Sequence, residues 1–154
     1  MERRGDVSQT SQLSVKTVPP GSVGLVWQHV LPMIRRGLAR GEGDSTTSDI
    51  LRIDVERGDK ILWAVTDGDE ILAAVILNIV QHPAKRTLFV VLVAGKDMHR
   101  WLGMIQDLLL DFKDLVGADT VEASVRDGLT RWLSKTGWKR KATIMQLDST
   151  GGRS

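Results

Sequence analysis

The feature that most constrains the fold is an amphipathic segment that lies between two short apolar segments in the second half of the chain. Apolar residues recur at helical spacing over Met98–Leu115, whereas Thr87–Ala94 and Thr120–Val125 have the length and composition of strands. A helical crossover of this length joins parallel strands. We therefore expect a parallel strand pair connected by a helix, with Asp97 as its N-cap and Gly117 as its end.

Two more apolar runs predict an antiparallel hairpin before this unit. Lys60–Thr66 and Glu70–Val80 flank Asp67-Gly68-Asp69, and glycine and aspartate tolerate the positive φ that tight turns require. A second reversal at Gln81–Lys85 leads into the strand at Thr87–Ala94. Because Glu70–Val80 is apolar almost throughout, we expect the sheet to be covered on both faces.

The first third of the chain predicts two helices. Apolar residues at helical spacing indicate a helix over Val23–Ala39, with a kink or a break at Pro32 because proline removes a backbone donor. Thr47 or Ser48 can cap a second helix that runs toward Arg57.

The end of the chain adds a short helix at Leu129–Lys135 and a last strand at about Lys139–Leu147. The whole order predicts an α/β (α+β) domain, in which a mixed sheet combines an antiparallel meander with one parallel pair and has helices on both faces. Residues 1–20 have few large apolar side chains, so we expect a flexible N-terminal arm there. We expect one domain over residues 21–148 and a disordered tail at residues 149–154.

The composition excludes several kinds of site. The chain has no cysteine, which excludes disulfides, thiolate nucleophiles and sulfur-ligated metals, and we expect no metal site. Its 21 basic and 19 acidic residues give a net charge of +2, which does not indicate a surface for nucleic acid. No apolar run approaches the roughly 20 residues of a membrane span, and the N-terminus lacks the apolar centre of a signal peptide. We therefore expect no membrane association.

Five tryptophans are present. Four of them fit the predicted apolar stripes and strands, so we expect Trp27, Trp63, Trp101 and Trp132 in the core. An interaction patch that contains Trp101 or Trp132 is the alternative.

Residues 23–147 resemble the GNAT superfamily of acyl-CoA-dependent N-acetyltransferases. The most similar stretch is VEASVRDGLTRWLSKTGW, which matches a strand, a short helix and a closing Gly-aromatic pair in these proteins. The chain also resembles short GNAT-like proteins of tailed bacteriophages, in LWAVTDGDEILAAV, in AGKDM before a Trp-containing helix, and in Arg126-Asp127-Gly128. The resemblance implies a GNAT-like sheet and, in active members, an acyl-CoA cofactor.

The resemblance also implies where that cofactor would bind. In active members its pantetheine arm pairs with an exposed strand, and its diphosphate binds amides at the start of the next helix. The loop that matches here has a single glycine, and Asp97 would satisfy the same amides and repel a diphosphate. Cations beside the loop could offset that repulsion. If acetyl-CoA binds, the matching positions are Val91, Val93, Gly95, Lys96, His99 and Arg100.

Proton transfer is the second function that the resemblance implies. Family enzymes often protonate the leaving thiolate with a tyrosine, and the matching position is Leu133, which cannot donate a proton. Ser134 is adjacent but points about 100° away on a helix. Glu122 and Asp127 are the candidates for a general base, which accepts a proton directly or through water. Each also has a plain structural alternative, Glu122 as an exposed strand residue and Asp127 as a cap. More distant options for the base are His82 and His99.

We favour a phage-type GNAT-fold protein that has lost catalysis and acts in a virion or in assembly by binding another phage or host protein. Its basis is the missing tyrosine, the glycine-poor loop and the phage-like segments. The alternative is an acyl-CoA-dependent N-acetyltransferase that acts on an amine of a small molecule or protein. Host-directed binding that counters a bacterial defence is a third option without residue-level support. We expect a location in the virion or the host cytoplasm, and the strand at Lys139–Leu147 could pair in a homodimer.

Overall fold

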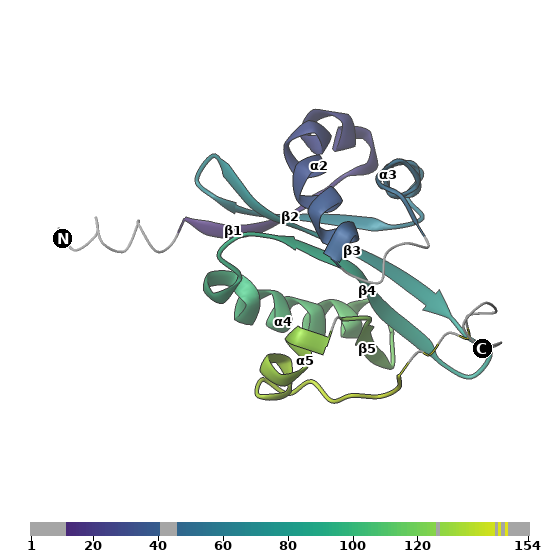
Figure 1. Ribbon diagram of the computed structural model, residues 1–154. Coiled ribbons are helices and arrows are strands. Elements are labelled where there is room, and N and C mark those ends of the chain that lie inside the picture. The colour runs from purple at the N-terminus through teal and green to yellow at the C-terminus, as the bar shows by residue number, and fades with distance from the viewer. Residues whose placement is uncertain (1–11, 41–45, 126, 144, 146, 148–154) are drawn as a thin grey trace. The chain divides into compact units, whose positions relative to one another are not determined.

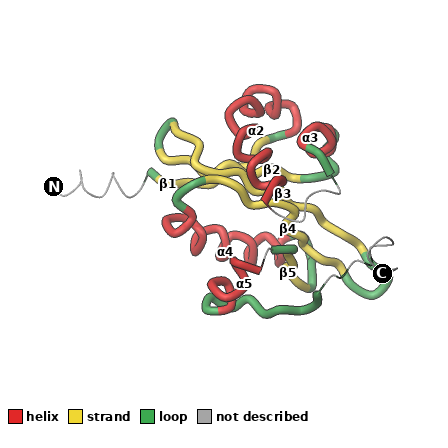
Figure 2. The backbone as a smooth tube through the Cα atoms, in the orientation of Figure 1, coloured by secondary structure: helices red, strands yellow, loops and turns green. Residues whose placement is uncertain are grey.

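The computed structural model describes residues 12–40, 46–125, 127–143, 145 and 147. The chain forms two compact units, residues 1–124 and residues 125–154, and each is described by itself. The first unit contains a five-stranded sheet in the order β1-β2-β3-β4-β5 (Figures 1 and 2). Its strands are β1 (Leu13–Val18), β2 (Ile61–Asp67), β3 (Glu70–Gln81), β4 (Arg86–Gly95) and β5 (Thr120–Ala123). Its helices are η1 (Pro20–Ser22), α2 (Val23–Arg40), α3 (Ser48–Glu56) and α4 (Met98–Leu115).

The sheet has the predicted mixed pairing. β2, β3 and β4 form an antiparallel meander, with the turn at Asp67-Gly68-Asp69 between β2 and β3. β5 returns through α4 and pairs parallel with β4, so that Thr87 lies opposite Thr120. The predicted fold class, a mixed sheet with one parallel pair, is therefore confirmed.

Helices cover both faces of this sheet, as the apolar character of β3 predicts. Figure 1 shows α2 and α3 on one face and α4 on the other. Trp27 and Ile34 of α2 pack into the core of the first face, and α4 buries Trp101 and Ile105. Because Trp101 is fully buried, it cannot belong to an interaction patch. The side chain of Trp132 lies outside the described residues.

The two predicted helices of the first third are present. Thr47 caps α3, because its hydroxyl accepts a hydrogen bond from the Ile50 amide at 3.2 Å. α2 is one continuous helix, so the predicted break at Pro32 is not found. Its apolar stripe is buried before and after the proline, at Val30 and Ile34, and this packing holds both halves of α2 on the sheet.

The prediction of a flexible arm over residues 1–20 is wrong for its last third. Leu13–Val18 forms β1, which pairs antiparallel with β2 along its whole length. The segment has too few large apolar side chains to order itself, but it gains backbone hydrogen bonds from an existing strand. Residues 1–11 lie outside the described residues.

The second unit contains α5 (Asp127–Ser134), close to the predicted bounds. The strand predicted at Lys139–Leu147 is wrong, since the residues described in that stretch form no strand. Two of its described apolar side chains are solvent-exposed, with 87% of Met145 and 88% of Leu147 accessible, so their burial does not favour an extended pairing. A homodimer through this strand thus loses its basis. The single domain over residues 21–148 stays a prediction.

Candidate functional site

β4 is the strand that organises the candidate site. Ile76 of β3 lies opposite Leu92, and Leu77 lies opposite Val90, so Val91 is an extra residue that forms a β-bulge. β5 pairs with β4 only as far as Val90. From Val91 to Gly95, β4 therefore keeps β3 along one edge and has no described strand along the other.

The hydrogen-bond directions show which groups lie on this open edge. The Lys96 amide donates to the Leu72 carbonyl of β3 at 3.0 Å. Backbone groups alternate between the two edges of a strand, so Leu92 and Ala94 also turn their amides toward β3. Val93 and Gly95 consequently turn their N–H and C=O groups toward the open edge. These are the groups to which an extended ligand could add as a further strand.

Gly95 is sterically required at the end of β4. Its φ is +154°, and a Cβ atom there would lie 2.3 Å from the Leu72 carbonyl oxygen and 2.5 Å from Ala73. Any side chain would push β4 away from β3 at this point. The loop's single glycine therefore keeps the open edge and the following helix close to the sheet.

Asp97 does not act as predicted. It occupies the N-cap position of α4, but its side chain makes no capping hydrogen bond, and its backbone is left-handed at φ 59° and ψ 39°. Aspartate is one of the few non-glycine residues that adopt this region readily, because its short polar side chain can hydrogen-bond locally. The first amides of a helix have no partner within the helix, so those of Met98 and His99 lie free of the Asp97 carboxylate. The prediction that this carboxylate satisfies them is wrong.

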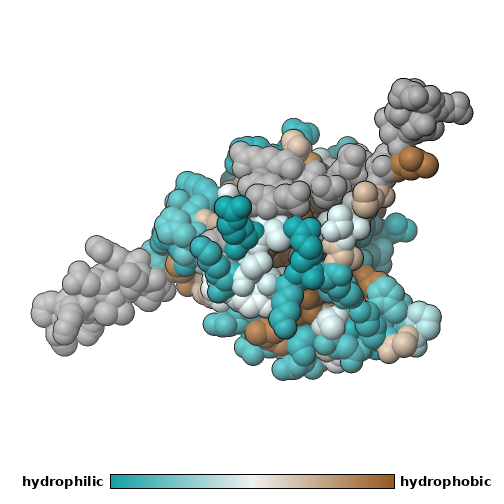
Figure 3. Space-filling model, turned by 60° about the horizontal axis from the view of Figure 1, so that its bottom comes forward, coloured by the Kyte–Doolittle hydropathy of each residue, from teal (hydrophilic) through white to brown (hydrophobic). Residues whose placement is uncertain are grey.

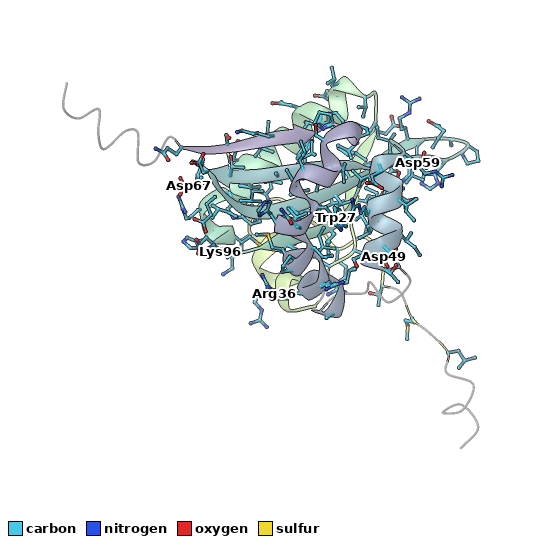
Figure 4. All side chains as sticks on the ribbon, turned by 90° about the horizontal axis from the view of Figure 1, so that it is seen from above. Trp27, Arg36, Asp49, Asp59, Asp67 and Lys96 are labelled. Atoms are coloured by element: carbon cyan, nitrogen blue, oxygen red, sulfur yellow. The ribbon has the colours of Figure 1, made fainter. Side chains whose placement is uncertain are left out.

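The cations of the loop are already paired. Lys96 Nζ lies 2.6 Å from Glu70 Oε2, and Arg100 Nη2 lies 3.0 Å from Asp67 Oδ2. The hydrogen bond and the negative charge of Glu70 raise the pKa of Lys96 above its ordinary value of 10.5. Figure 4 shows Asp67 and Lys96 at the same end of the sheet.

Sequence reasoning missed Glu70 and Asp67 as parts of this site. The signal was available in the register, because β3 and β4 are antiparallel and Ala73 lies opposite Gly95. Such a register brings the start of β3 beside the end of β4. The residues of the β2–β3 turn thus face the loop that follows β4.

Glu122 lies near the point where β4 and β5 part. It is opposite Phe89, two residues before the bulge, which corresponds to about 7 Å along the strand. Its carboxylate is 3.2 Å from Lys85 Nζ and 3.4 Å from the Thr120 hydroxyl. About a quarter of the side chain is accessible to solvent.

The other predicted proton-transfer residues belong to the second unit or to turns. Ser134 donates its hydroxyl to the Thr130 carbonyl at 2.8 Å, within its own helix. Leu133, which matches the family tyrosine, is buried. Asp127 begins α5, and its side chain lies outside the described residues. His82 and His99 are both exposed, His82 in the turn before β4 and His99 in the first turn of α4.

A metal site and a membrane-spanning helix are two further features that a chain of this kind could contain. In the part of the chain that the structure describes, no three His, Cys, Asp or Glu side chains lie together so as to hold a metal ion. Within the same residues, no helix has the length and apolar character needed to cross a bilayer.

The fold is similar to that of solved acetyltransferases. A GCN5-related N-acetyltransferase from Ralstonia eutropha JMP134 matches with a TM-score of 0.63 and 16% identity, over 89% of this chain and 99% of that one. A predicted acetyltransferase from Clostridium acetobutylicum, solved with acetyl-CoA, matches with a TM-score of 0.67 and 10% identity, over 92% and 99%. An aminoglycoside acetyltransferase from an uncultured soil metagenomic sample, in complex with sisomicin, matches with a TM-score of 0.65 and 10% identity, over 89% and 95%.

No protein-family model matches the sequence, and no curated protein matches it. At 10% to 16% identity, the structural matches show a shared fold. The chain therefore has a GNAT-like fold, as its sequence resemblance implies.

Proposed function

We propose that this chain is an acyl-CoA-dependent N-acyltransferase that acts on an amine. The observation that carries the proposal is the open edge of β4, where Val93 and Gly95 present backbone groups directly before the uncapped amides of Met98 and His99. A linear ligand with an amide-bearing arm and a terminal diphosphate has the chemistry that this succession recognises. The acetyl-CoA in the Clostridium neighbour supports this assignment.

The residues present fit the two parts of such a cofactor that protein backbone groups can bind, the pantetheine arm and the diphosphate. The open edge of β4 would hold the pantetheine arm, and the start of α4 would hold the diphosphate, with Lys96, His99 and Arg100 beside it. When bound, acyl-CoA supplies an acyl group activated as a thioester. Glu122 is placed to accept a proton from the substrate's ammonium group directly or through water, which frees the amine to attack, while Lys85 holds its carboxylate in place.

Replacement of Val93 by proline tests the proposal. Proline removes the N–H that the proposed cofactor would use, and it spares the hydrogen bonds to β3, which Val93 does not make. We expect Val93→Pro to weaken acetyl-CoA binding at least tenfold by isothermal titration calorimetry, about the loss of one or two hydrogen bonds. Release of free thiol from acetyl-CoA, assayed with a panel of primary amines, should fall in parallel.

Val93→Ala is the matched control. It keeps the amide and removes only side-chain atoms, so acetyl-CoA should bind nearly as tightly as to the wild type. Equal affinity in the proline variant would show that the edge is not used. A wild-type protein that binds no acetyl-CoA would overturn the proposed function.

A second candidate is a GNAT-fold protein without catalysis that binds another protein. This candidate is favoured by two observations. Lys96 and Arg100 are already paired with carboxylates, and position 133 is a leucine. The face drawn in Figure 3 gives it little support, because its coloured hydrophobic residues are scattered among hydrophilic ones. Phage origin, a virion or assembly role, and a location in the virion or host cytoplasm stay predictions. The same titration separates the two candidates.

A further inference from the structure

We infer that the carboxylates of Asp67 and Glu70 compete with the diphosphate of acyl-CoA for Lys96 and Arg100, so that the β2–β3 turn sets the affinity for the cofactor. This inference rests on the proposed function and deepens it. It assigns a role in setting cofactor affinity to two residues outside the strand and loop that would contact the cofactor.

The contacts place each carboxylate on a different cation of the loop. Glu70 holds Lys96 from the first residue of β3, and Asp67 holds Arg100 from the last residue of β2. Asp97 Oδ2 lies 3.9 Å from Arg100 Nη1, so a third carboxylate faces the same guanidinium. Both cations that could meet a diphosphate are thus engaged by acidic groups of the protein itself.

The charge balance at this end of the sheet opposes a diphosphate. Four carboxylates lie in or beside the loop, those of Asp67, Asp69, Glu70 and Asp97, against the two cations Lys96 and Arg100. An incoming diphosphate adds negative charge to an acidic surrounding, and like charges at short range repel one another. Neutral residues at the turn would lower that repulsion. They would also free Lys96 and Arg100 from their ion pairs.

The pairs are exposed enough to exchange. The side chains of Lys96 and Glu70 are 59% and 55% accessible, and those of Arg100 and Asp67 are 33% and 26% accessible. Exposed ion pairs are weak because water competes for both partners. An open surface depression adjoins the turn and is lined in part by Glu70, so that the Glu70 side chain borders solvent. The cations can therefore leave the carboxylates for a phosphate.

Neutral variants of the turn test the inference. We expect Glu70→Gln to tighten acetyl-CoA binding about twofold to fivefold, and Asp67→Asn/Glu70→Gln to tighten it about threefold to tenfold. Isothermal titration calorimetry at 50 mM salt measures both. Because salt screens exposed charges, the gain should shrink at 500 mM salt. S-acetylpantetheine, which has no phosphate, should bind all variants with the same affinity.

Two single variants serve as controls. Asp59→Asn removes an exposed carboxylate that Figure 4 shows far from Lys96, and it should leave binding unchanged. Asp69→Asn removes a carboxylate of the same turn that forms no ion pair with another described residue, so it should tighten binding less than Glu70→Gln does. Equal tightening by Asp69→Asn would contradict competition for the cations, since only the general field would then matter.

The outcomes separate this inference from the proposed function. If the wild type binds acetyl-CoA and the Glu70 and Asp67 variants bind it equally or more weakly, the competition is wrong and the proposed function stands. If the wild type binds acetyl-CoA and the double variant binds it more tightly, the competition is supported. If no variant binds acetyl-CoA, both proposals are wrong. A melting curve shows whether Asp67→Asn disturbs the turn. If it does, the single variant Glu70→Gln still tests the inference.

Discussion

At the scale of single residues, the loop after β4 differs most from expectation. Asp97 is predicted to cap α4 with its carboxylate, but its backbone is left-handed and its side chain makes no capping hydrogen bond. Residue type alone does not fix such a conformation, because aspartate both caps helices and tolerates positive φ. The ion pairs of Lys96 and Arg100 depend on strand register, which single residues do not show.

The raised pKa of Lys96 leads to a prediction about its reactivity. Only the neutral amine reacts with an acylating reagent, and Glu70 raises the pKa of Lys96, which lowers the neutral fraction at a given pH. In Glu70→Gln that pKa falls back toward its ordinary value, so Lys96 should be labelled faster at pH 9. Mass spectrometry measures the rate, with Lys16 in the same protein as the internal reference. A Lys96 rate that is unchanged or lower in the variant would contradict the pairing.

At the scale of elements, periodicity predicted much of the first unit. The β2–β3 hairpin, β4, the crossover through α4 and the parallel β5 all follow from apolar spacing and turn residues. β1 was missed because an edge strand of six residues depends on its neighbour rather than on its own side chains. The described residues of the strand predicted after Gly137 form no strand, and Met145 and Leu147 are exposed there, so their burial does not favour pairing.

Replacement by alanine should have opposite effects on stability at two helical glycines. A Cβ atom on Gly37 would lie 2.9 Å from both Ala94 Cβ and Leu92 Cδ1, whereas one on Gly103 of α4 would meet nothing within 4 Å. Gly103→Ala should stabilise the protein by about 0.5–1 kcal/mol, since alanine favours the helix. Gly37→Ala should be about 1–3 kcal/mol less stable than Gly103→Ala, because α2 must shift on β4. Urea unfolding of both variants measures the difference, and equal stabilities would contradict the close packing of α2 on β4.

At the scale of the whole molecule, the fold was predictable and the activity was not. The order of elements predicts a mixed sheet with helices on both faces, and structural neighbours confirm a GNAT-like layout. The open edge of β4 was expected only from the resemblance, because no residue signals that two strands part. The ion pairs of Lys96 and Arg100 could be found only from the structure.

Thermal unfolding checks the cofactor at this scale. Acetyl-CoA at about 100 times its dissociation constant should add about 2.7 kcal/mol to the free energy of unfolding. For a protein of this length, each kcal/mol raises Tm by about 2–4 °C, so we expect a rise of about 5–10 °C. S-acetylpantetheine at an equal multiple of its own dissociation constant should give a similar rise. A flat Tm at saturating acetyl-CoA would argue for the non-catalytic candidate.

The bulge at Val91 has a consequence for backbone dynamics. Beyond the bulge, successive amides of β4 differ in their hydrogen bonding. The amides of Leu92 and Ala94 face β3, whereas those of Val93 and Gly95 lie on the open edge. Deuterium should therefore replace every second amide proton quickly and leave those between protected, a stepwise pattern within one strand. A ligand bound along the edge would protect the Val93 and Gly95 amides as well. The loss of the alternating exchange pattern would therefore report, residue by residue, where the ligand lies.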